Sequence, residues 1–136
     1  MSISDKTLRR KWSLRYLAAA ALLLIFAGVY ESFSHGVCSP RMVFAFLIPL
    51  ILGLGPWLAY TALCRRIPHT WTRLWWNWAL ATLTAGSLLA GTLEIYGTTN
   101  RLLRAYPPAG LMLGLLALGT ELREYRRAVI LPKSGR

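Results

Sequence analysis

Ala27-Gly28-Val29-Tyr30-Glu31-Ser32-Phe33 ends the first long apolar run of the chain, and Ala90-Gly91-Thr92-Leu93-Glu94-Ile95-Tyr96 ends the third. In both stretches an alanine and a glycine precede one carboxylate, by four and three residues. Residues four apart share a helix face, so each glutamate lies above a small side chain that leaves room for a neighbouring backbone. The two stretches indicate that one structural unit occurs twice, with Glu31 and Glu94 in equivalent positions.

The duplication extends to both sides of these stretches. The offset from Glu31 to Glu94 also pairs Trp12 with Trp75, and after the following turn a slightly shorter offset pairs Arg65-Arg66 with Arg126-Arg127. We interpret the chain as two tandem copies of one helical hairpin, a parallel internal repeat covering about residues 12–66 and 75–127.

The composition indicates a membrane protein. The chain has 136 residues, of which 55% are hydrophobic and 15% charged, and its mean hydropathy is +0.43. The apolar residues fall in runs, and a helix needs about 17–25 such residues to cross roughly 30 Å of hydrocarbon. The sequence predicts an all-α membrane protein, one transmembrane domain over residues 1–136, with four transmembrane helices at about residues 14–33, 42–64, 75–96 and 104–121.

The first of these helices also has the layout of a signal peptide, because a basic segment precedes the apolar run. We expect it to be retained, since it continues directly into the Glu31 stretch that the second copy shares. The residues before Cys38, His35-Gly36-Val37, lack the small residue expected in front of a lipoprotein cysteine.

Several residues bear on how the helices pack. Pro49 and Pro56 each remove a backbone hydrogen bond, so the second helix should be kinked. Gly110 and Gly114 have the spacing of a close helix–helix contact, although the pattern alone says little about dimerisation. The last span is short, and Glu121 at its end would have to reach toward the headgroups.

The charges predict the orientation of the helices. Thirteen Lys and Arg residues lie in the N-terminal segment, the loop after the second helix and the C-terminal tail, against three in the other two loops. The positive-inside rule then places both termini in the cytoplasm and Glu31 and Glu94 near the outer face. The net charge of +11 lies at helix ends, where it suits lipid headgroups. Nucleic acid is not an expected partner.

The candidate site is an outer cluster of polar residues that could bind a cation, a proton or a polar ligand, because ionisable groups in a membrane are functional candidates. The alternative is structural, with each glutamate paired to an arginine of the outer loops, Arg41, Arg101 or Arg104. The candidate residues are Glu31, His35, Glu94, Asn100 and Arg101.

Several chemistries lack the residues they require. His35 and His69 fall on opposite sides of the predicted membrane, so they cannot hold a haem together, and a tetrahedral zinc site has too few ligands. No Ser-His-acid arrangement and no phosphate-binding glycine loop can be identified. We expect no catalytic residues, no metal and no cofactor.

The stretches Tyr30–Val37 and Leu93–Arg101 resemble those of small, uncharacterised four-helix integral membrane proteins of bacteria, over most of the chain. The resemblance implies the four-helix architecture and carries no activity or site residue with it.

We expect a small multi-pass protein of the bacterial inner or plasma membrane, acting as a non-enzymatic accessory subunit or membrane scaffold. Its partners would be the lipid bilayer and either further copies of itself in a homo-oligomer or another membrane protein. The alternative is a small ion- or ligand-binding or transport protein that uses the outer-face pair of glutamates, Glu31 and Glu94.

Overall fold

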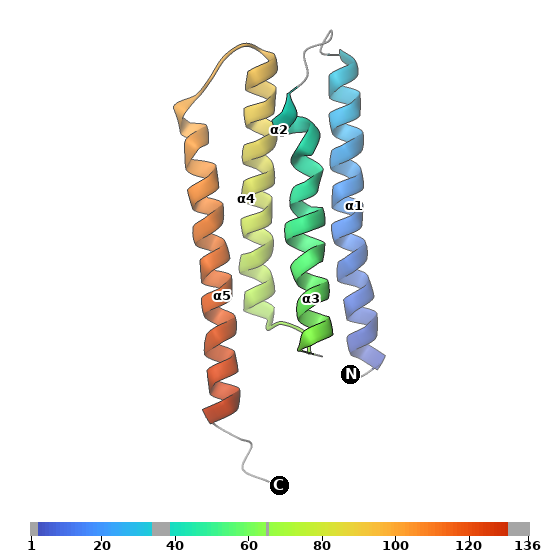
Figure 1. The fold of residues 1–136 in the computed structure, drawn as a ribbon, viewed down its shortest axis with the longest axis vertical. Helices are drawn as coiled ribbons and strands as arrows, with labels where there is room; N and C mark the ends of the chain where they lie inside the picture. The colour runs from blue at the N-terminus through green and yellow to red at the C-terminus, as the bar shows by residue number, and fades with distance from the viewer. Residues whose placement is uncertain (1–2, 34–38, 65, 131–136) are drawn as a thin grey trace.

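The computed structural model describes residues 3–33, 39–64 and 66–130, and these residues form helices joined by short connections (Figure 1). Four stretches are long and apolar enough to cross a membrane, which confirms the expectation of an all-α chain with four such helices. They are Asp5–Phe33, Pro40–Leu63, Thr70–Ile95 and Arg101–Ala128.

The four stretches differ in regularity. The first and third are the uninterrupted helices α1 (Ile3–Phe33) and α4 (Thr70–Ile95). The fourth begins with a 3₁₀ turn, η3 (Arg101–Ala105), and continues as α5 (Tyr106–Ile130). The second is composite and consists of α2 (Pro40–Val43), the 3₁₀ segment η1 (Phe44–Phe46), the π-helical segment η2 (Ile48–Leu54) and α3 (Gly55–Leu63).

The irregular second span follows from its prolines. Pro49 lies at the start of the π-helical segment and Pro56 at the start of α3. Each proline lacks the N–H that an α-helix uses at that position, so the hydrogen-bond pattern changes locally. Pro49 and Gly53 are buried, so the irregular segment is turned toward the neighbouring helices.

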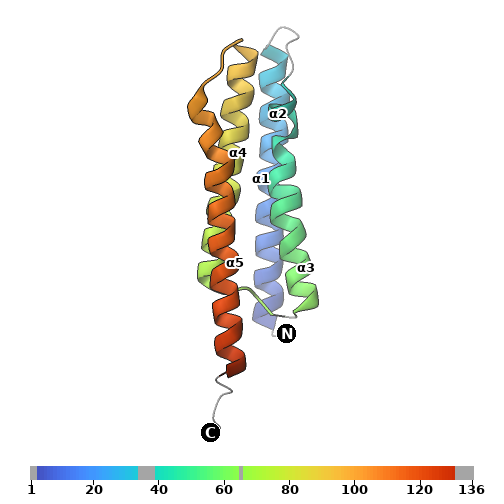
Figure 2. The same cartoon turned by 60° about the vertical axis from the view of Figure 1, so that its left-hand side comes forward.

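The helices pack as two hairpins that meet along α4. In Figures 1 and 2, α1 runs beside the second span and α5 runs beside α4, and α4 also contacts α2 and η2. Among the described residues, the backbone of α5 approaches only α4 and η3. One flank of α5 is therefore left open.

One cluster of buried core residues lies in the half of the bundle where α1 begins. Tyr16, Trp57 and Leu80 are buried there, and Trp12 and Trp76 pack against them. The Tyr16 hydroxyl donates a hydrogen bond of 2.9 Å to Asn77 Oδ1, which ties α1 to α4. These side chains thus hold the first hairpin against α4.

Glycines allow the closest helix approaches. A Cβ atom on Gly91 would lie 2.7 Å from Met42 Cβ, so α2 can reach α4 only because this residue is glycine. A Cβ on Gly110 would lie 2.6 Å from Leu83, so α5 packs closely on α4 at this residue, whereas a Cβ on Gly114 would meet only Trp76, at 3.9 Å. Gly28, which precedes Glu31 by three residues as Gly91 precedes Glu94, faces open space.

Helices α1, α4 and α5 extend beyond the apolar runs that indicated them, and α1 begins at Ile3 rather than at about residue 14. Helix α4 starts at Thr70, where the Trp71 N–H donates to His69 Nδ1 (3.4 Å). Helix α5 continues to Ile130, and Arg127 pairs with Glu124 on its surface (3.4 Å). A hydropathy pattern detects the apolar part of a helix, whereas the backbone hydrogen bonds continue into the polar part.

Candidate functional site

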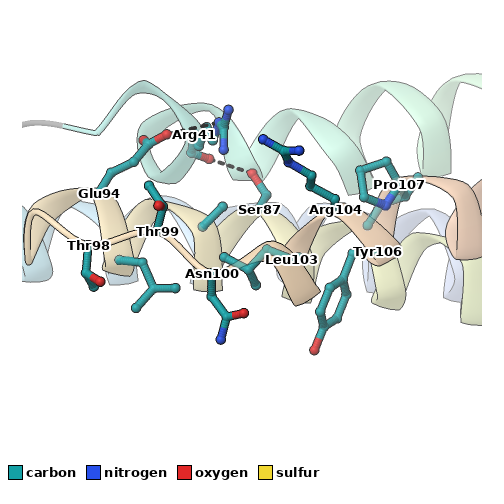
Figure 3. Close-up of a pocket in the computed structure, with 14 residues that line it drawn as sticks. Arg41, Ser87, Glu94, Thr98, Thr99, Asn100, Leu103, Arg104, Tyr106 and Pro107 are labelled. Atoms are coloured by element: carbon teal, nitrogen blue, oxygen red, sulfur yellow. Dashed lines mark hydrogen bonds and ion pairs between the residues drawn. The ribbon is translucent and has the colours of Figure 1, made fainter.

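A pocket of about 600 Å³ lies at the end of the bundle where α4 terminates (Figure 3). One face of α4, the turn after it, the start of the last span and one residue of α2 line this pocket. The residues are Leu83, Gly86, Ser87, Ala90, Leu93 and Glu94 of α4, Thr98, Thr99 and Asn100 of the turn, Leu103, Arg104, Tyr106 and Pro107 of the last span, and Arg41 of α2.

The turn that closes the pocket is set by Gly97. The Gly97 N–H donates to Glu94 O (3.1 Å) and the Thr98 N–H to Leu93 O (3.0 Å), a Schellman ending of the helix. Gly97 has a φ of 68°, in the left-handed region that glycine adopts without strain. Asn100 Oδ1 then accepts from Leu102 N (2.9 Å) and starts η3.

Glu94 joins α4 to the start of the second span. Its Oε1 lies 3.1 Å from Arg41 Nε, and its Oε2 accepts a hydrogen bond of 2.6 Å from the Ser39 hydroxyl. The Ser87 hydroxyl donates to the backbone oxygen of Arg41 (2.6 Å), so the backbone of Arg41 is also fixed to α4. Both carboxylate oxygens contact groups of the other hairpin. Glu94 therefore connects the start of the second span to α4.

The structure brings together two of the five predicted site residues. Glu94 and Asn100 line the pocket, whereas Arg101 is exposed beside it and is not part of the lining. Glu31 is partly buried at the end of α1 and is not part of the lining either. His35 lies outside the described residues.

The sequence indicated Arg41 and Arg104 only as possible ion-pair partners of the glutamates, and the structure places both in the pocket lining. Arg104 forms no ion pair with any described residue. Ser39 and Ser87 were missed, because nothing in the sequence shows that Ser39, before α2, and Ser87, within α4, contact each other's segments. The glutamate–arginine pairing was open to three arginines, and the close approach at Gly91 favours Arg41 because it brings α2 against α4.

A second polar cluster at the opposite end of the bundle surrounds Glu121. Glu121 Oε1 accepts hydrogen bonds from the Tyr60 hydroxyl and from Arg66 Nη2, the latter at 2.9 Å. Glu121 Oε2 accepts from the Thr72 hydroxyl (2.8 Å) and from the backbone N–H of His69 (3.2 Å). The side chain of Glu121 is only 14% exposed. It ties α5 to α3, α4 and their connection.

Arg66 completes this cluster from the connection after α3. Its Nε donates to the Tyr60 hydroxyl (2.9 Å), and this hydrogen bond raises the pKa of Arg66 above its ordinary value. The guanidinium therefore stays charged opposite Glu121. Five residues from three helices and one loop form the cluster, so no local sequence motif could have indicated it.

No group of three or more His, Cys, Asp or Glu residues is placed to hold a metal ion within the described part of the chain. Comparison with protein-family models, curated proteins and solved structures found no match. The assignment of roles to these residues therefore rests on their geometry.

Proposed function

We propose that the protein is a non-enzymatic multi-pass membrane component, an accessory subunit or scaffold. The observation that carries this proposal is the engagement of both Glu94 oxygens, by Arg41 Nε at 3.1 Å and by Ser39 Oγ at 2.6 Å. A general base or a cation ligand needs a carboxylate oxygen that can reach its substrate. In Glu94 each oxygen already has a partner from the start of the second span, which favours a structural role.

The second cluster supports the same role. Glu121 also has both oxygens engaged, with donors from α3, from α4 and from the connection between them. The two acids thus hold helices together at opposite ends of the bundle. This use of acids favours a protein that provides a stable transmembrane framework.

The proposal includes the orientation and the tandem repeat. The distribution of thirteen against three basic residues supports cytoplasmic termini, with the pocket at the outer face. The similar spacing around Glu31 and Glu94, both near the C-terminal ends of helices, supports the repeat.

The open flank of α5 supports association with another membrane helix. Leu111, Met112, Leu115 and Leu122 are exposed on α5. Such side chains suit lipid or a neighbouring transmembrane helix, from a second copy or from another membrane protein.

Native mass spectrometry of the full chain, extracted gently with its lipids, tests the proposed function. We expect one defined oligomer or one stoichiometric complex with a membrane protein. The scaffold role would be contradicted by a monomer that carries a bound small molecule or metal, if the mass of that ligand is lost in the double variant Glu31→Gln, Glu94→Gln.

A second candidate function, ligand binding, is favoured by the pocket itself. Its volume of about 600 Å³ falls in the range of small-molecule sites, roughly 300–1,000 Å³. In this case the glutamate would shape the pocket while other groups contact the ligand.

A further inference from the structure

The charges that line the pocket at the end of α4 are unequal. Of the described residues in its lining, Arg41 and Arg104 are cationic and Glu94 is the one acid. Glu94 is already neutralised by Arg41 at 3.1 Å, which leaves Arg104 without an opposing charge in the pocket. A cation would meet this excess positive charge, whereas an anion would be attracted by it.

The geometry of the two arginines suits an anion. Arg41 uses Nε for its contact with Glu94, and a guanidinium has further N–H donors on its terminal nitrogens. Figure 3 shows the guanidinium groups of Arg41 and Arg104 directed toward the same part of the pocket, above Ser87. Arginine is well suited to phosphate and carboxylate because its planar donors match their oxygens.

The remaining lining is divided between apolar and polar groups. Leu83, Ala90, Leu93 and Leu103 provide apolar walls, while the turn contributes the polar residue Asn100. Asn100 uses its Oδ1 to start η3, and its side chain points away from the two arginines (Figure 3). A molecule with an anionic head and an apolar part fits such a lining better than a bare metal ion does.

We propose that the pocket between α4, η3 and Arg41 binds a phosphate group, with Arg104 as its principal charged contact. Phosphate could come from a lipid headgroup or from free phosphate, and the lining chemistry is the same for both. The inference deepens the ligand-binding candidate and is independent of the scaffold role.

The test uses the full chain purified in a neutral detergent. Apparent Kd values are measured by native mass spectrometry for phosphatidylglycerol and phosphatidylcholine, and by calorimetry for inorganic phosphate. The variant is Arg104→Gln. Arg101→Gln is the matched control, because it removes the same charge from the same 3₁₀ turn but lies outside the lining.

We expect Arg104→Gln to weaken binding about tenfold or more, because it removes charge-assisted hydrogen bonds. Arg101→Gln should change it less than about twofold, because its contribution is a screened long-range one. If the protein binds phosphatidylglycerol tightly but does not bind inorganic phosphate, the ligand is a lipid. If it binds inorganic phosphate and this binding depends on Arg104, the ligand is a free anion. Equal losses in both variants, or no preference for the anionic lipid together with no phosphate binding, would overturn the proposal.

A second variant guards against misfolding of Arg104→Gln. Thr99 is exposed on the turn and lines the pocket, so Thr99→Trp fills the pocket and keeps every charge. It should weaken phosphate binding to a similar degree, and unchanged binding would place the anion elsewhere and refute the site. Loss of phosphate binding in a protein that still forms its oligomer refutes the phosphate site and leaves the scaffold role unaffected. A bound small molecule or metal that is lost in the Glu31→Gln, Glu94→Gln double variant contradicts the scaffold role and leaves the phosphate site unaffected.

Discussion

Replacement of Glu121 by alanine is the most informative perturbation of the fold. It removes the acceptor of four hydrogen bonds, from Tyr60, Arg66, Thr72 and the backbone of His69. Breaking a buried ion pair costs about 3–5 kcal/mol when the remaining charge stays buried. The side chain of Arg66 is 39% exposed and can regain water, so we expect a loss of about 2–4 kcal/mol in unfolding free energy, and less for Glu121→Gln.

The measurement is unfolding in mixed micelles, followed by the fluorescence of the six tryptophans. Glu124→Ala is the matched control, because Glu124 lies one turn away on the same helix and pairs with the exposed Arg127 at 3.4 Å. A surface pair of this kind contributes at most about 1 kcal/mol. Equal effects of the two substitutions would refute the reasoning that Glu121 fastens α5 to the bundle.

Two further predictions concern packing and topology. Gly91→Ala should destabilise the protein by about 1–3 kcal/mol, because the new methyl group would lie 2.7 Å from Met42 Cβ. Gly28→Ala should be neutral or stabilise it by up to about 1 kcal/mol, because Gly28 faces open space in a helix. The same unfolding assay measures both, and equal effects would contradict the close approach of α2 to α4. The topology is tested with a membrane-impermeant maleimide. In intact cells it should label Cys38 in the Cys64→Ser variant. In the Cys38→Ser variant it should label Cys64 only after the cells are opened. The reverse pattern would show that the charge distribution has been misinterpreted.

The four spans were predictable from sequence because long apolar runs have few alternatives to a membrane helix. Their ends were less predictable. Helix α5 extends nine residues past Glu121, to Ile130, because a helix can continue in water where the apolar run has ended. The irregular second span was indicated by Pro49 and Pro56, since proline changes backbone hydrogen bonding wherever it occurs.

The sites were only partly predictable. Glu94 and Asn100 were found because polar residues are conspicuous beside an apolar run. The choice of Arg41 as the partner of Glu94 depends on the close approach at Gly91 and on the two serines, Ser39 and Ser87. Such contacts arise from the packing of separate helices, and the same is true of the donors around Glu121.

The contact between Arg41 and Glu94 is the centre of the proposed scaffold role, and exchange of the two charges tests it most directly. Arg41→Glu and Glu94→Arg should each destabilise the protein by about 1 kcal/mol or more, because each places like charges together. In the double variant the opposite charges face each other again, and the Ser39 hydroxyl can accept from the new guanidinium. The account predicts that the double variant regains at least half of the lost unfolding free energy. A double variant as unstable as the sum of the two single variants would contradict it.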